Sequence, residues 1–183
     1  MYLDDERIEK GVLRQGDIIA DVHLLGAINI NSIQYSSTVG SEPNQYVSWS
    51  IPSSPKYGDA MVLSHSCEID PGNKIKLTSI ILAPLRDINT ATAQEKIQDL
   101  IDSNEIDRTE PQSSYLKYFY VYPNENLKFH NGAIVDFSKC FSLRRQSYDI
   151  LLINKIAQLN NEATLSMALK LALYFHRDGN ALN

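Results

Sequence analysis

A dense polar cluster, residues 64–70 (SHSCEID), contains the residue types that could perform nucleophilic chemistry. A cysteine thiolate needs a nearby base, and alternation along an extended chain would place His65 and Cys67 on one face. With the carboxylate of Glu68, these residues are catalytic candidates for a cysteine-dependent enzyme. The plainer interpretation is that Cys67 is a small buried hydrophobe, His65 is hydrogen-bonded, and Glu68 and Asp70 shape a turn.

A second set of residues has the chemistry that RNA cleavage requires. Such cleavage needs an acid or base near a 2′-hydroxyl and a cation near the phosphate, and Arg86, Arg144 and Arg145 could meet His65 at one mouth of a barrel. The simpler explanation of Arg144 and Arg145 is a solvated strand end. The formal net charge of −5 argues against coating a nucleic acid by charge alone, so we expect a local basic cleft instead.

Aromatic side chains could bind the bases of a single strand by stacking. The candidates are four tyrosines in one short stretch: Tyr115, Tyr118, Tyr120 and Tyr122. Alternating Tyr and Phe is also ordinary strand composition, so the pattern has two interpretations.

Metal and cofactor binding have little support in the sequence. His65, Cys67, His130 and Cys140 are ligand types that zinc accepts, but no close CxxC or HxxxH spacing accompanies them. We therefore predict neither a metal nor a cofactor. The two cysteines, the acidic and polar first ten residues and the lack of a long apolar run predict a cytoplasmic protein with reduced thiols and no membrane association.

The elements that must position these residues are mainly short strands. Period-two patterns and turn residues predict strands over 17–24, 28–33, 46–51, 59–64, 77–85, 115–122 and 133–143. The strands over 59–64 and 77–85 contain consecutive apolar residues, so we expect both to be central and buried on both faces. The turn residues 70–73 (DPGN) predict a hairpin between these two strands.

Two segments carry helical periodicity. Residues 90–102 predict a surface helix with Ile97, Leu100 and Ile101 on one side. Asn160 or Asn161 is a predicted cap of a C-terminal helix. Its expected apolar stripe consists of Leu165, Ala168, Leu169, Ala172, Leu173 and Phe175.

Together these elements predict one domain over residues 1–183, mainly β in an α+β fold. A small curved barrel is expected over 12–85 and 115–145, with a helical insertion over 87–114 and a C-terminal helical segment over 150–178. The stretch 26–56 is a second candidate insertion.

Several short motifs resemble the MazF/PemK endoribonuclease toxins in both content and order. Residues 14–19 (RQGDII) resemble the opening strand of that family, and residues 60–64 (AMVLS) resemble its second strand. Residues 80–85 (IILAPL) resemble the next strand, and 132–136 (GAIVD) with 142–145 (SLRR) resemble a strand leading to a basic residue. The resemblance touches roughly a quarter of the chain and implies an SH3-like barrel.

The resemblance also implies function, with a departure at the family's catalytic positions. Such toxins generally cleave RNA with an Arg just before the second strand and a Thr or Ser just after a Pro-aliphatic pair, which here is Pro84 and Leu85. In this chain, residues 58–60 (GDA) occupy the first position and residues 86–87 (RD) occupy the second. We expect a toxin-like protein of a bacterial or phage defence system that binds or cleaves single-stranded RNA. The resemblance implies a homodimer and an antitoxin-like or subunit partner. The alternatives are an inactive barrel acting as an interaction or sensor module, and the Cys67-centred enzyme.

Overall fold

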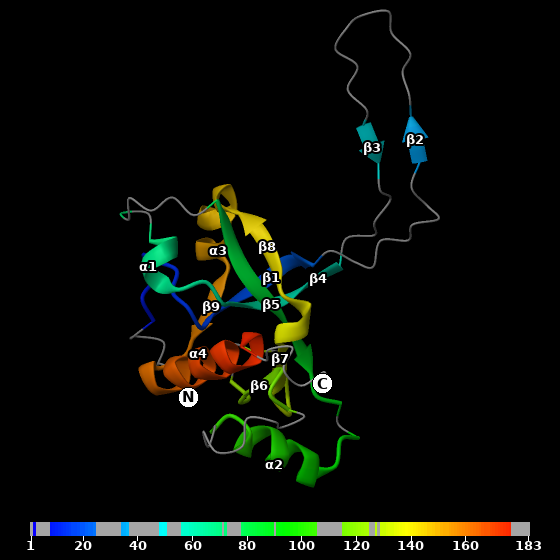
Figure 1. Ribbon diagram of the computed structural model, residues 1–183, viewed down its shortest axis with the longest axis vertical. Helices are drawn as coiled ribbons and strands as arrows, with labels where there is room; N and C mark the ends of the chain where they lie inside the picture. The colour runs from blue at the N-terminus through cyan, green and yellow to red at the C-terminus, as the bar shows by residue number, and fades with distance from the viewer. Residues whose placement is uncertain are drawn as a thin grey trace, which may run out of the picture. The chain divides into compact units, whose positions relative to one another are not determined.

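A computed structural model gives the architecture of the chain (Figure 1). It describes residues 2, 8–24, 34–36, 48–50, 56–70, 72, 78–89, 91–105, 115–124, 127 and 129–176. The strands are β1 (Asp17–Leu24), β2 (Gln34–Ser36), β3 (Ser48–Ser50), β4 (Lys56–Val62), β5 (Ser79–Asp87), β6 (Tyr118–Val121), β7 (Ala133–Asp136), β8 (Phe141–Arg144) and β9 (Lys155–Gln158). The helices are α1 (Ser66–Ile69), α2 (Gln94–Asp102), α3 (Tyr148–Ile153) and α4 (Asn161–Phe175), with 3₁₀ turns η3 (Phe137–Lys139) and η4 (Arg145–Ser147).

The main sheet has seven strands in the order β6-β7-β5-β4-β1-β9, with β8 also paired to β5. The long strand β5 organises it: its first half pairs with β8, its middle with β4 and its last residues with β7, all antiparallel. This arrangement confirms the predicted α+β class dominated by a curled antiparallel sheet, consistent with a small barrel.

Strands β4 and β5 pair antiparallel at the centre of the sheet, as predicted, but helix α1 lies in their connection, and residues 71 and 73 of the predicted turn lie outside the described residues. Met61, Val62 and Leu63 are all buried, as expected for a strand covered on both faces. The same expectation for β5 is wrong at Ile81, whose side chain is 45% exposed between the buried Ile80 and Leu82. One face of β5 is therefore partly open at this point.

Strand β1 departs from the predicted alternation because its pairing with β9 shifts between Ile18 and Ile19. Both isoleucines are fully buried, and Asp21 takes a positive φ of 52°. An irregularity of this kind lets consecutive side chains face the core. The alternation of Ile18, Ala20 and Val22 expected from the sequence is thus interrupted.

A buried ion pair joins β1 to β9. Nζ of Lys155 lies 2.8 Å from Oδ2 of Asp17, and both side chains are almost fully buried. Oδ2 also accepts a hydrogen bond from the backbone N–H of Arg14, whereas Oδ1 has no partner within the described part of the chain. Burial raises the pKa of Asp17 to about 6, although Lys155 and the Arg14 N–H both oppose this rise.

The single strand predicted over 133–143 is two strands separated by a 3₁₀ turn. Asp136 caps the turn η3, because its Oδ1 accepts hydrogen bonds from both the backbone N–H and the hydroxyl of Ser138. β7 and β8 consequently pair with different parts of β5. The predicted turn before them is confirmed at Gly132, where φ is +79°.

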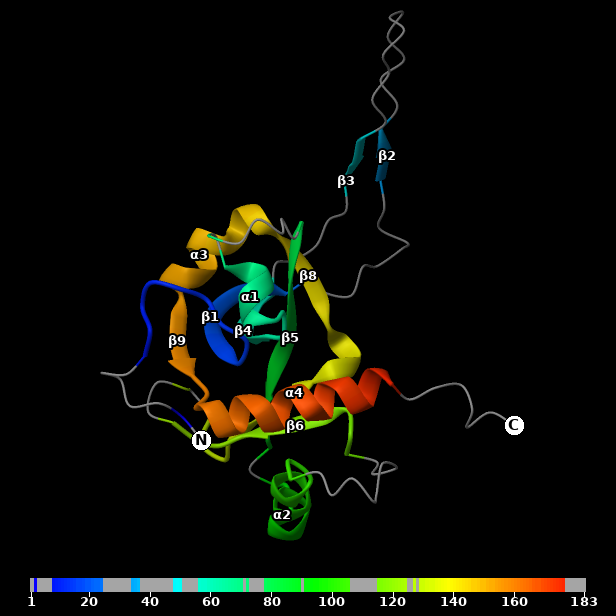
Figure 2. The same cartoon turned by 60° about the vertical axis from the view of Figure 1, so that its left-hand side comes forward.

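Helices α2 and α4 lie where the sequence predicts them, and β6 lies between them (Figure 2). Phe119 and Val121 of β6 belong to the core that includes Met167 of α4, whereas Tyr120 packs with Ile97 and Leu100 of α2. Alternation along β6 therefore gives each helix its own face of the strand.

The predicted apolar stripe of α4 is wrong, although the predicted cap at Asn160 is confirmed by a 2.8 Å bond from the N–H of Ala163. The buried positions are Ala163, Met167 and Lys170, while Leu165 is 62% and Phe175 is 64% exposed. Apolar residues are present on most faces of α4, so the sequence did not reveal which face the sheet covers.

Residues 23–57 form a compact unit separate from the rest of the chain, and its described strands β2 and β3 make an antiparallel hairpin. The strand predicted over 46–51 is confirmed at Ser48–Ser50, and the strand predicted over 28–33 lies outside the described residues. In the described part of the chain, no helix is both long enough and apolar enough to span a membrane.

Candidate functional site

The polar cluster at 64–70 leaves the sheet at a fixed point. The backbone N–H of Leu63 donates to the carbonyl of Ile81 over 2.9 Å, and the buried hydroxyl of Ser64 accepts from the N–H of Ile81 over 2.8 Å. Ser64 thus replaces a backbone partner where β4 has already ended. The chain that enters His65 is therefore attached to β5 at Ile81, directly before His65.

His65 and Cys67 meet, but not for the predicted reason. The chain does not continue as a strand through them; it turns into the short helix α1, for which His65 is the N-cap. Nδ1 of His65 lies 2.9 Å from Sγ of Cys67 and accepts a hydrogen bond from the Cys67 backbone N–H over 3.3 Å. An Nδ1 that accepts this N–H carries no proton, so its one lone pair is shared between the backbone N–H and the thiol, which is then the donor in the Nδ1–Sγ contact.

Both side chains of this pair are exposed, so the plainer interpretation of Cys67 as a buried hydrophobe is wrong. They line a hollow of about 320 Å³. Its other described walls are Val12, Leu13, Arg14, Ser66 and Asp70. The thiol therefore faces a space that a small substrate could enter.

Sequence reasoning missed the contribution of the chain before β1 to this site. The backbone N–H of Gln15 donates to Oγ of Ser66 over 3.1 Å, and its side-chain amide donates to the carbonyl of Leu63 over 2.7 Å. Arg14 lines the hollow and is ion-paired with Glu9. The only sequence signal was the turn before β1, where Gly16 takes a φ of +87°.

Arg145 lies at the same end of the sheet and holds the other end of α1. Its guanidinium donates to the carbonyls of Glu68 over 3.3 Å and of Asp70 over 3.0 Å, which satisfies acceptors at a helix C-terminus. Arg144 is exposed on β8 next to it, and the side chain of Glu68 is exposed. His65, Cys67, Glu68 and the arginine pair thus share one region.

Arg86 does not join this group, which corrects the predicted convergence. It lies near the far end of β5, whereas Ser64 contacts Ile81 and Arg144 lies opposite Ser79. At ~3.3 Å per strand residue, the backbone of Arg86 lies roughly 20 Å along β5 from the positions that face Ser64 and Arg144. Its Nη1 instead pairs with the buried carboxylate of Asp136 over 3.0 Å.

The predicted tyrosine platform is not assembled as a single exposed surface. Tyr120 is 3% exposed and its hydroxyl donates to the carbonyl of Asn131, so its ring cannot stack on a base. Tyr118 is half-buried, and Nζ of Lys117 lies 4.9 Å from its ring centroid. Neither tyrosine supports the RNA-binding prediction.

Cys140 differs from Cys67 in its surroundings. It is half-buried and its thiol donates to the carbonyl of Phe137 over 2.9 Å. Burial, and then the charge of Asp136, raise the pKa of its thiol to about 11. Within the described residues, no three His, Cys, Asp or Glu side chains are grouped so that they could hold a metal ion.

Comparison with known proteins adds no family to this geometry: no protein-family model matches the chain, and no curated protein matches it. The toxin resemblance rests on its short motifs alone. The site must be interpreted from its own residues.

Proposed function

We propose that the protein is a cysteine-dependent enzyme whose nucleophile is Cys67 and whose base is His65. The observation that carries the proposal is the 2.9 Å separation of Sγ and Nδ1 in an exposed pair at the wall of a hollow. A nucleophilic thiol within hydrogen-bond reach of an imidazole is the arrangement that activated cysteines share.

The chemistry that fits the pair is acyl transfer from an activated ester or thioester. The Sγ–H bond of Cys67 breaks, its proton moves to Nδ1 of His65 as Nδ1 releases the Cys67 backbone N–H, and the sulfur electron pair forms a bond with the carbonyl carbon. The leaving group departs with the proton from Nδ1. The oxygen of a water molecule then attacks the acyl carbon while Nδ1 accepts a proton from the water. The carbon–sulfur bond breaks, and this proton moves to the sulfur as the acid product leaves.

The experiment is acylation by p-nitrophenyl acetate, followed by p-nitrophenolate release and by peptide mapping of the acetyl group. We expect acetylation at Cys67 and its loss in Cys67→Ser. His65→Asn should slow the reaction about 100-fold, because an amide oxygen still accepts the Cys67 N–H at the N-cap but is a very weak base. Cys140→Ser is the matched control and should react like the wild type.

Two outcomes would contradict the proposal. One is an acetyl group distributed equally between Cys67 and Cys140. The other is a His65→Asn variant that reacts at the wild-type rate while thermal unfolding shows an intact fold.

A second candidate function, RNA cleavage, is supported by the contact of Arg145 with the C-terminal end of α1, the helix whose N-cap is His65. In this proposal His65 is the base toward the 2′-hydroxyl and the exposed Arg144 contacts phosphate. Incubation with a mixed single-stranded RNA pool and mapping of new 5′ ends tests it. Defined cleavage that is lost in His65→Asn and retained in Cys67→Ser would favour this function over the thiol enzyme; Arg86→Ala is the distant control.

The interaction-module alternative is supported by a different observation, the exposed apolar side chains of α4. Leu165 and Leu169 lie one helical turn apart and are 62% and 44% exposed. Exposed patches of this kind mark protein contacts. Sedimentation of the wild type against Leu165→Glu tests whether this face pairs two copies of the chain; a monomer in both cases argues against the homodimer.

A further inference from the structure

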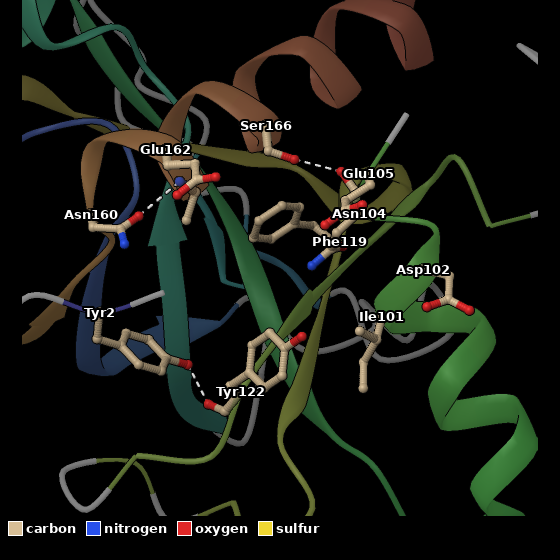
Figure 3. A pocket seen from close by; sticks show the side chains of 11 residues that line it. Tyr2, Ile101, Asp102, Asn104, Glu105, Phe119, Tyr122, Asn160, Glu162 and Ser166 are labelled. Carbon is tan, nitrogen blue, oxygen red and sulfur yellow. Dashed lines mark hydrogen bonds between the residues drawn. The ribbon is translucent and has the colours of Figure 1, made fainter. Parts of the chain in front are cut away.

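Two hollows of the fold differ in where their charged side chains lie. The larger cavity, of about 500 Å³, lies between the start of α4, the end of α2 and β6 (Figure 3). Its charged lining residues Asp102, Glu105 and Glu162 are all exposed. The smaller hollow, which the candidate nucleophile faces, has a wall that contacts the buried ion pair of Asp17 and Lys155. Two buried charges therefore lie directly behind the candidate thiol site.

The amine of Lys155 binds the backbone of the segment 9–12 from the protein interior. Its Nζ donates to the carbonyl of Glu9 over 2.9 Å and to the carbonyl of Val12, a wall residue of the hollow, over 3.3 Å. Oε1 of Gln158 accepts from this amine and from the N–H of Glu9, both over 3.1 Å. The first wall residue is thus attached to strand β9.

The next two wall residues are bound through their N–H groups. The buried hydroxyl of Tyr148 accepts the N–H of Leu13 over 3.0 Å. Oδ2 of Asp17 accepts the N–H of Arg14 over 2.7 Å. All three residues of the wall segment 12–14 consequently have a backbone group that is fixed by a buried side chain from another element.

The segment 145–158, which contains η4, α3 and β9, holds two walls of the hollow at once. At its start, Arg145 binds two carbonyls at the C-terminal end of α1, the helix that contains Cys67. Further along, Tyr148 and Lys155 bind the wall segment 12–14. The distance between the nucleophile and this wall therefore depends on one continuous piece of chain.

The wall is attached to α1 by different contacts. The N–H of Gln15 donates to Oγ of Ser66 over 3.1 Å, and the side-chain amide of Gln15 donates to the carbonyl of Leu63 over 2.7 Å. Neither contact involves Lys155 or Tyr148. Loss of the contacts behind the wall should therefore displace residues 12–14 while α1 stays in place.

A buried ion pair is an unfavourable way to hold a wall for stability alone. Desolvation of two charges offsets much of their attraction, and Oδ1 of Asp17 has no partner in the described part of the chain. Side chains that are locked by buried hydrogen bonds do, however, keep a site in the geometry that its reaction needs. We propose that Lys155 and Tyr148 are positioning residues of the thiol site, which hold the segment 12–14 where it contacts the acyl group of the substrate; this role rests on the proposed function.

The first experiment follows acylation by p-nitrophenyl butyrate as a function of ester concentration. Tyr148→Phe removes only the hydroxyl that accepts the Leu13 N–H. We expect the ester concentration at half-maximal acylation to rise about fivefold, while the maximal rate changes less than about twofold, because the contact of His65 with Cys67 lies within α1 and its cap. Lys155→Met should have at least the same effect. A lower maximal rate with unchanged half-saturation would overturn the proposal.

Two further variants separate positioning from stability. Lys155→Met/Asp17→Asn should regain part of the melting temperature that Lys155→Met loses, yet keep the raised half-saturation, because the carbonyls of Glu9 and Val12 still lack their donor. Gly132→Ala should lower the melting temperature at a turn that lines no part of the hollow and leave half-saturation unchanged. Half-saturation that simply follows melting temperature across the variants would mean that the role is structural only.

A second readout requires no turnover, so it separates this proposal from the proposed function. Peptide mass spectrometry measures the alkylation rate of Cys67 by iodoacetanilide, whose phenyl group can contact the wall, relative to the rate with iodoacetamide. We expect this ratio to fall severalfold in Tyr148→Phe and Lys155→Met and to keep its wild-type value in Gly132→Ala. Absence of acylation in the wild type would contradict the proposed enzyme only, whereas a ratio that is equal in all variants would overturn the positioning role.

Discussion

Nδ1 of His65 lies 2.9 Å from Sγ of Cys67 and also accepts the backbone N–H of the same cysteine. One nitrogen lone pair therefore both caps α1 and faces the thiol. This double role fixes the tautomer of the imidazole, because the proton must be on Nε2 for Nδ1 to accept.

The first prediction concerns the relative reactivity of the two cysteines toward iodoacetamide. At pH 7.5 Cys67 should be alkylated at least about tenfold faster than Cys140, because the reactive species is the thiolate and burial raises the pKa of the Cys140 thiol to about 11. Mass spectrometry of digested samples over time measures both rates. Cys140 should accelerate only as the pH approaches 11; faster modification of Cys140 at pH 7.5 would contradict the described environment.

The second prediction concerns the buried pair of Asp17 and Lys155. Lys155→Met should lower the free energy of unfolding by about 3–5 kcal/mol, because it leaves the carboxylate of Asp17 buried without its cation. Urea unfolding measures the change. The exposed Lys139→Met is the control, and a further Asp17→Asn substitution should restore part of the loss; a single variant as stable as the wild type would argue against the pair.

The third prediction is a pH dependence that comes from Lys170. Because burial lowers its pKa from 10.5 to about 7, the folded chain releases this proton near pH 7 while the unfolded chain keeps it until about pH 10.5. The unfolded state binds more protons between these values, so the stability that this group contributes rises with pH there, by up to about 1.4 kcal/mol per unit.

Lys170→Met isolates this contribution. The difference in unfolding free energy between wild type and variant should shift in favour of the wild type from pH 7 to pH 10 and stay constant below pH 6. A difference that is independent of pH over the whole range would mean that Lys170 is charged in the folded protein throughout.

The fourth prediction tests the turn before β7. Gly132 has a φ of +79°, and a Cβ built there would lie 2.6 Å from the carbonyl oxygen of Val121. Gly132→Ala should therefore cost about 1–3 kcal/mol of stability. At Gly11 an added Cβ meets nothing within 4 Å, so Gly11→Ala is the matched control in the same thermal unfolding experiment. Equal melting temperatures would contradict the described turn.

The sequence by itself determined the α+β class, the positions of α2 and α4, the cap at Asn160 and the turn at Gly132. These features depend on local patterns: period two or 3.6, a capping side chain, and a glycine where φ is positive. It also identified residues 64–70 as the segment richest in chemistry. Side-chain type alone supports that inference.

Only the tertiary structure decided how those residues meet. Arg86 and Arg145 are both arginines at strand ends, but register along β5 separates them, and no local pattern encodes register between distant strands. The buried face of α4, the pairing of β9 with β1 and the contribution of Arg14 and Gln15 to the thiol site also depend on contacts between segments far apart in the chain. His65 and Cys67 meet because a helix begins at Ser66, in a segment too short for a periodic signal.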